Sequence, residues 1–60
     1  MQLGSILIRK DDGVEFKVIE YGFWSRITNG DTTDDVKFAW PSPDGDIFVG
    51  ANSGRSYTLK

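Results

Sequence analysis

The sequence contains no cysteine and no histidine, and these two absences exclude several kinds of site. Without cysteine the chain has no disulfide and no thiolate ligand for a metal ion. Without histidine it lacks the commonest zinc ligand and the only side chain that normally titrates near neutral pH. We therefore expect a domain that binds no metal and no cofactor.

Groups suited to catalysis are also scarce among the residues that are present. Histidine is the most frequent general base, and a nucleophilic Ser, Thr or Lys needs a base beside it. The adjacent carboxylates Asp34 and Asp35 fall in a polar segment, where we expect them to stay solvated. The segments Asn29–Asp31 and Asp44–Asp46 carry oxygen ligands, but turn propensity explains both, and neither has the spacing of a calcium loop. The sequence predicts that the protein is not an enzyme.

No apolar run is long enough to span a bilayer, and residues 1–10 lack the pattern of a secretory signal. The absence of cysteine fits a reducing compartment, so we expect a cytoplasmic protein without a membrane partner. The chain has 60 residues and a net charge of −2, so we interpret residues 1–60 as one domain. A domain this short buries only about 60% of its unfolded surface, which makes self-association a plausible source of stability.

Short runs of alternating apolar and polar residues, each closed by a turn signal, dominate what is present. Val, Ile, Phe, Trp, Tyr and Thr are concentrated in these runs, whereas all seven Asp lie in or beside the turns. Val14–Tyr21 shows the clearest two-residue period. The six predicted strands are Ser5–Lys10, Val14–Tyr21, Phe23–Thr28, Val36–Trp40, Asp46–Gly50 and Arg55–Leu59.

This pattern predicts an all-β fold, and a small SH3-like antiparallel barrel of five to six short strands fits it best. A small open β-sandwich and an OB-like barrel are the alternatives. Asp12-Gly13 favours a type I′ hairpin turn, and Gly22 suggests a bulge or corner between two strand-like runs. Pro41 and Pro43 should end the fourth strand. The last strand is expected at a sheet edge, where it is free to pair with a partner.

The alternation also divides the side chains between two faces. We expect one set to fill the core: Val14, Phe16, Val18, Phe23, Ile27, Val36, Phe38, Trp40, Ile47, Val49, Tyr57 and Leu59. We expect a second set to face outward, interleaved with Arg9, Lys17, Arg26 and Lys37: Leu7, Ile19, Tyr21, Trp24 and Phe48. A closed barrel would fold several members of this second set into further core.

The outward aromatic and basic residues are the candidate binding site. Exposed Trp, Tyr and Arg are typical of protein-binding hot spots, so we predict a small binding module whose partner is another protein or a second copy of itself. Aromatic rings between basic residues also suit single-stranded nucleic acid, but a pI near 4.7 makes this the second hypothesis. The predicted partner-binding residues are Trp24, Tyr21, Arg26, Lys17 and Phe48.

Overall fold

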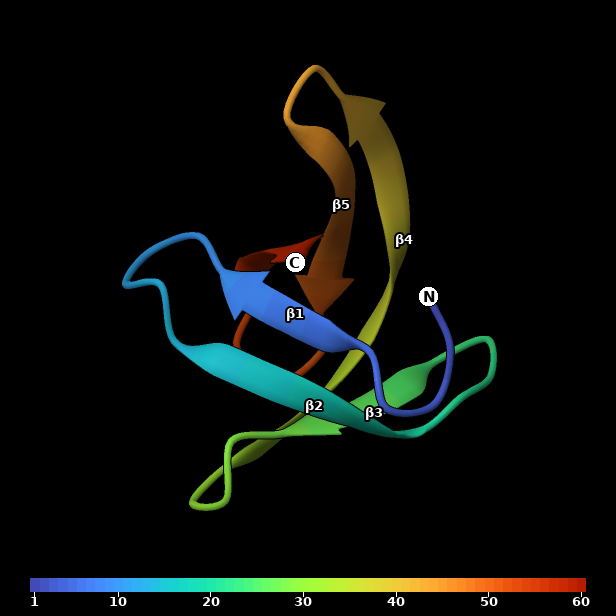
Figure 1. Ribbon diagram of the computed structural model, residues 1–60, viewed down its shortest axis with the longest axis vertical. Coiled ribbons are helices and arrows are strands. Elements are labelled where there is room, and N and C mark those ends of the chain that lie inside the picture. Colours follow the sequence, from blue (N-terminus) through green and yellow to red (C-terminus); the bar gives the residue numbers. More distant parts are fainter.

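The computed structural model describes all 60 residues and contains six strands closed into one antiparallel barrel (Figure 1). Each strand pairs with its neighbours in the sequence, and the last strand pairs with the first. The predicted all-β barrel is confirmed, and closure excludes the open sandwich. The architecture is consistent with an SH3-like barrel. The strands are β1 (Ile6–Arg9), β2 (Glu15–Glu20), β3 (Ser25–Thr28), β4 (Thr33–Ser42), β5 (Gly45–Gly50) and β6 (Ser56–Leu59).

The predicted edge strand is wrong, because β6 pairs with both β1 and β5. The corner expected at Gly22 is also wrong. Residues 21–24 form the loop of a β2–β3 hairpin, and the irregularity in that pair lies earlier, between Val18 and Glu20. The β1–β2 hairpin is confirmed, but only Gly13 of its turn has a positive φ, and a type I′ turn requires two such residues.

β4 is the longest strand and extends beyond the expected stop at Pro41. Pro41 pairs in register with Asp46 of β5, whereas β3 pairs with β4 only as far as Val36. The side of β4 that faces away from β5 is therefore unpaired at Pro41, and a missing N–H is tolerated on such an edge. This β4–β5 hairpin projects past the other strands in Figure 1.

The core is a cluster of seven buried side chains inside the barrel. Two of them, Leu7 and Phe48, were expected to face outward. Both lie in runs that are apolar on both faces, Ile6-Leu7-Ile8 and Ile47-Phe48-Val49, so alternation alone does not show which face is inside. Ile47 is buried as well, outside this cluster. The cluster consists of Leu7, Phe16, Val18, Ile27, Val36, Phe48 and Tyr57.

Four residues expected in the core are exposed instead: Phe23, Phe38, Trp40 and Leu59. Phe23 belongs to the β2–β3 loop rather than to a strand. Phe38 and Trp40 lie on the projecting half of β4, and the pairing shifts between them, so Phe38 faces Phe48 and Trp40 faces Ile47. Leu59 is the last residue of β6.

Because neighbouring strands are antiparallel, the loops divide between two ends of the barrel. The β1–β2, β3–β4 and β5–β6 loops form one end, which we call the polar mouth (residues 10–14, 29–32 and 51–55). The β2–β3 loop and the β4–β5 turn form the other, the aromatic end. The chain forms no helix, and hence none that is able to cross a membrane. All eight exposed large apolar side chains lie toward the aromatic end: Leu3, Ile19, Tyr21, Phe23, Trp24, Phe38, Trp40 and Leu59.

Candidate functional site

The β2–β3 loop presents three aromatic residues in succession around Gly22. Phe23 is 80% exposed, Tyr21 is 61% exposed and Trp24 is 42% exposed. The loop is held by Ser25, which is fully buried. Its hydroxyl accepts a hydrogen bond from the Gly22 N–H at 3.3 Å and donates one to the Gly22 carbonyl at 3.2 Å. These rings are therefore displayed on a hydrogen-bonded turn rather than on a loose segment.

Lys37 of β4 joins this loop to form the aromatic–lysine cluster, which we define as Phe23, Trp24 and Lys37. The two rings meet edge to face, with their centroids 6.2 Å apart. The Lys37 ammonium lies 5.0 Å from the Trp24 ring centroid and 5.8 Å from that of Phe23. Cation–π attraction of this kind fixes the lysine over the rings and keeps a positive charge beside an apolar surface.

The five predicted binding residues differ in their exposure and in their contacts. Trp24 and Tyr21 are exposed on the loop, and Lys17 is exposed on β2. Arg26 is exposed on β3 but lies between two carboxylates, 3.6 Å from Glu20 and 3.2 Å from Asp35. Phe48 is only 6% exposed, and its ring packs against Phe38 at 6.0 Å. The prediction of Phe48 as a binding residue is therefore wrong, because its side chain fills the barrel.

Sequence reasoning missed Phe23, the most exposed aromatic residue of the chain. It was assigned to the core because it alternates with Ser25 and Ile27, as a strand residue would. The available signal was Gly22 immediately before it, since Gly suits a loop better than a strand interior. Lys37 was expected to face outward, but no pattern in the sequence indicated that it would lie over Phe23 and Trp24.

The polar mouth is organised by Asp34, whose carboxylate was expected to be solvated and is only 3% exposed. Oδ1 accepts hydrogen bonds from the backbone N–H groups of Asp35 and Asn52, at 2.8 and 3.0 Å. Oδ2 accepts them from the hydroxyls of Ser53 and Tyr57, at 2.6 and 3.0 Å. With four donors engaged, this carboxylate ties β4 to the β5–β6 loop.

Gly50 makes room for this carboxylate. A Cβ atom at position 50 would lie 2.1 Å from Asp34 Oδ2 and 2.8 Å from its Cγ. Gly50 has no positive φ, so close approach rather than backbone conformation is what requires a glycine here. In the sequence, Gly50 only marks the predicted end of a strand. Its close contact with the Asp34 side chain is visible only in the structure.

The hydrogen bonds of the mouth shift the pKa values of its groups. Burial alone would raise the pKa of Asp34, but the bonds from Ser53, Asn52, Tyr57 and Asp35 together hold it below its usual value. Burial and the nearby Asp34 carboxylate raise the pKa of the Tyr57 hydroxyl. The hydrogen bond from Arg9 is the main cause that lowers the pKa of Asp12 to about 2.

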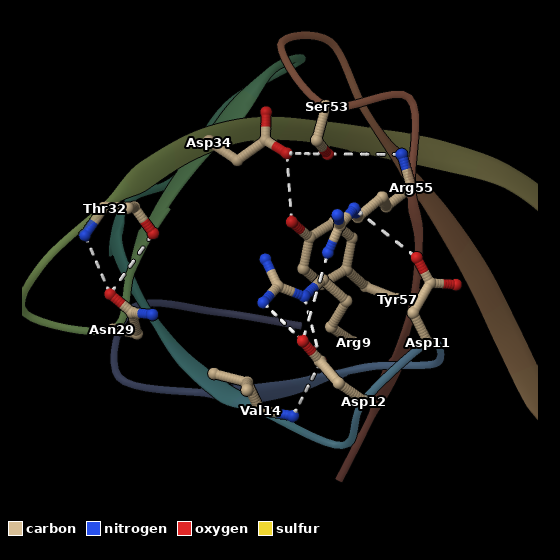
Figure 2. Close-up of polar contacts among 10 residues, drawn as sticks. All are labelled: Arg9, Asp11, Asp12, Val14, Asn29, Thr32, Asp34, Ser53, Arg55 and Tyr57. Atoms are coloured by element: carbon tan, nitrogen blue, oxygen red, sulfur yellow. Dashed lines mark hydrogen bonds and ion pairs between the residues drawn. The ribbon is translucent and has the colours of Figure 1, made fainter.

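A groove of about 580 Å³ opens at the polar mouth. Arg9 and Arg55 lie on one side of it, and the β3–β4 loop lies on the other (Figure 2). Both carboxylate oxygens of Asp34 accept hydrogen bonds from the protein, so neither is free to accept a proton from a ligand. Acidic side chains do not gather anywhere in groups of three that would hold a metal ion.

The sequence matches no protein-family model, and neither a curated protein nor a solved structure shows significant similarity to the chain. Any statement about function therefore rests on the chemistry of the two ends of the barrel.

Proposed function

We propose that this protein is a small non-catalytic binding module that recognises a protein partner through the aromatic–lysine cluster and Tyr21. The observation that carries the proposal is the exposure of Phe23, at 80%, on a turn held by buried Ser25. Exposing an aromatic ring to water is unfavourable, and burying it against a partner is favourable. Apolar residues gathered at one end of a small domain therefore indicate a contact surface. Large, rigid aromatic side chains are also the anchors that protein interfaces favour.

Single-stranded nucleic acid is the second candidate for the same surface, because Trp24 beside Lys37 offers a ring for stacking and a charge for a phosphate. The surrounding charges favour protein instead. Arg26 is paired with Glu20 and Asp35, and the chain carries a net charge of −2. Phosphate contacts need several unpaired cations along the strand, which this surface does not supply.

The test crosslinks each protein to the proteins that bind it and compares which of them are recovered. The wild type, Phe23→Ser and Trp24→Ala are used at equal concentration. Lys10→Ala is the control, since Lys10 is exposed at the opposite end. We expect one partner to be lost with both aromatic variants and kept with the control. Circular dichroism must show all four proteins folded. Equal recovery of the partner with Phe23→Ser would refute the proposal.

Two further measurements test whether the partner is a second copy of the chain or a nucleic acid. Sedimentation velocity of the wild type and of Phe23→Ser detects self-association, in which case the partner is a second copy. Titration with a random single-stranded oligonucleotide, followed by tryptophan fluorescence at low and moderate salt, tests the nucleic-acid candidate. A quench that weakens steeply with salt would replace protein by nucleic acid as the partner.

A further inference from the structure

The polar mouth contains an arginine whose guanidinium is already fixed in place. Arg9 donates from Nε and Nη2 to the two oxygens of Asp12, at 3.0 and 2.6 Å, and its guanidinium carbon lies 5.1 Å from the centroid of the Phe16 ring. Its side chain is only 17% exposed. The remaining nitrogen, Nη1, does not bond Asp12; it lies beside the hydroxyl of Tyr57 in Figure 2, with which the guanidinium also interacts. Of this fixed guanidinium, the Nη1 N–H that points away from Tyr57 is therefore left for an acceptor.

Asn29 supplies a second fixed donor from the opposite side of the groove. Its Oδ1 accepts hydrogen bonds from the backbone N–H groups of Asp31 and Thr32, at 2.9 and 2.8 Å, and from the Thr32 hydroxyl at 3.3 Å. Because two backbone donors require an oxygen there, the amide orientation is settled and Nδ2 must be the other atom. Nδ2 has no partner, and Figure 2 shows it on the side of Asn29 that faces the centre of the mouth.

Acceptors inside the groove, in contrast, are largely occupied. Asp34 accepts four hydrogen bonds, and Asp12 is paired with Arg9. Asp11 lies 3.4 Å from Arg55 Nε. The carboxylate of Asp31, on the rim, is the one acidic group of the lining that makes no side-chain contact.

We propose that the polar mouth is a binding site for a carboxylate, held between Arg9 Nη1 and Asn29 Nδ2. A planar acceptor with two oxygens can accept one hydrogen bond from the Arg9 Nη1 N–H and one from the Asn29 amide N–H, and the ligand needs no donor of its own. A phosphate dianion suits the site less well, because Asp31 and the ion-paired Asp11 and Asp12 surround it with negative charge. The site lies at the opposite end of the barrel from the aromatic–lysine cluster and is independent of the function proposed above.

The test uses N-acetylglycine, which resembles the carboxyl terminus of a peptide, and its neutral amide, which differs only in lacking the carboxylate. Nitrogen-15 NMR follows two reporters, the side-chain amide of Asn29 and Nε–H of Arg9. We expect N-acetylglycine to shift both signals saturably and the neutral amide to leave them in place. Acetate serves as a second probe, since a shift with acetate too shows that a free small carboxylate suffices. Equal shifts with the neutral amide, or none with either carboxylate, would overturn the proposal.

Two substitutions in one loop make the test specific. Asn29→Asp keeps the oxygen that caps the loop and replaces only the free donor by a charged acceptor, so we expect affinity for N-acetylglycine to fall by about tenfold or more. Asp31→Asn removes the rim charge and should raise affinity by about twofold. Arg9 Nε–H reports binding in both variants. Unchanged affinity in Asn29→Asp, weaker binding in Asp31→Asn, or tighter binding of inorganic phosphate than of N-acetylglycine would each contradict the carboxylate site.

Discussion

The two ends of this barrel are built from the same six strands and expose opposite kinds of surface. At the polar mouth, a buried carboxylate on β4 holds the β5–β6 loop, and an arginine is fixed by an aspartate. At the aromatic end, the loop and the projecting strand display rings to solvent, and few polar contacts join them. Hydrogen bonds and ion pairs tie the loops of the polar mouth together, whereas the aromatic end exposes apolar rings to solvent.

The difference shows how a 60-residue domain divides its aromatic residues between stability and contact. Of the eight aromatic side chains, three are buried, namely Phe16, Phe48 and Tyr57. A domain of this size gains from burying every large ring, since its core is marginal. The five exposed rings, all at one end, are therefore better explained by binding than by folding, and the hydrogen bonds of the mouth supply part of the stability that those rings do not.

The largest loss of stability is expected when the polar mouth loses the Asp34 carboxylate. Asp34→Ala leaves the hydroxyls of Tyr57 and Ser53 and the N–H of Asn52 without their acceptor. We expect the free energy of unfolding to fall by about 3 kcal/mol, a large fraction of the total for a domain of this size. Urea unfolding followed by circular dichroism measures it. A loss below about 0.5 kcal/mol would show that the network contributes little.

Gly50→Ala tests the same contact from the other side, because the new Cβ would overlap Asp34 Oδ2. We expect a loss of about 2 to 3 kcal/mol, as for other overpacked sites. The two changes should not add. Once Asp34 is alanine, the nearest remaining atom is the flexible Ser53 hydroxyl, at 2.9 Å, so alanine at position 50 should cost far less. Additive losses would mean that Gly50 is required for another reason.

Acid should loosen the mouth before it affects the aromatic end. The folded protein lowers the pKa of Asp34, and it lowers that of Asp12 from 3.8 to about 2. The stability that these carboxylates add is therefore complete above their unfolded pKa and is lost as the pH falls through the folded values. We expect the free energy of unfolding to decrease below pH 3.8 and Asp34→Asn to flatten that decrease. An identical pH dependence in the variant would place the acid sensitivity elsewhere.

The sequence predicts the strands of this fold well, because a two-residue period and glycine turns are local signals. Five of the predicted strands lie within about two residues of the observed ones at each end. Val36–Trp40 is the exception, since β4 runs from Thr33 to Ser42. Pro41 misled the prediction because a proline is tolerated on an edge that only the three-dimensional arrangement reveals.

The candidate sites are less visible in the sequence, because each depends on residues far apart in the chain. Asp34 contacts Ser53 and Tyr57 across 19 and 23 residues. Lys37 on β4 reaches the rings of the β2–β3 loop, which precedes β3 in the chain. Phe48 and Leu7 were placed on the wrong face because their neighbours are equally apolar. Barrel closure, rather than any local pattern, decides which of those faces is inside.

A smaller effect separates the hydrogen-bond network from the apolar packing beneath it. Tyr57→Phe keeps the ring, which packs edge to face on Phe16 at 5.3 Å, and removes only the hydroxyl that donates to Asp34. We expect a loss of about 1 kcal/mol, since three other donors still engage the carboxylate. Thermal unfolding of the variant beside Asp34→Ala provides the measurement. A loss as large as that of Asp34→Ala would mean that this one hydrogen bond provides most of the stabilisation from the network.

The smallest expected effect on stability belongs to the most exposed ring. Phe23→Ser removes a side chain that is 80% exposed and contacts Trp24 at its edge, so the free energy of unfolding should change by less than about 0.5 kcal/mol. Lys37 keeps its contact with Trp24 in this variant, which should preserve the rest of the surface. Urea unfolding measures this beside the binding experiment, because a residue of a binding surface should lose binding when it is replaced while the protein keeps its stability. A loss above about 1.5 kcal/mol would show that Phe23 supports the fold, and the contrast between a stabilising mouth and a binding end would then fail.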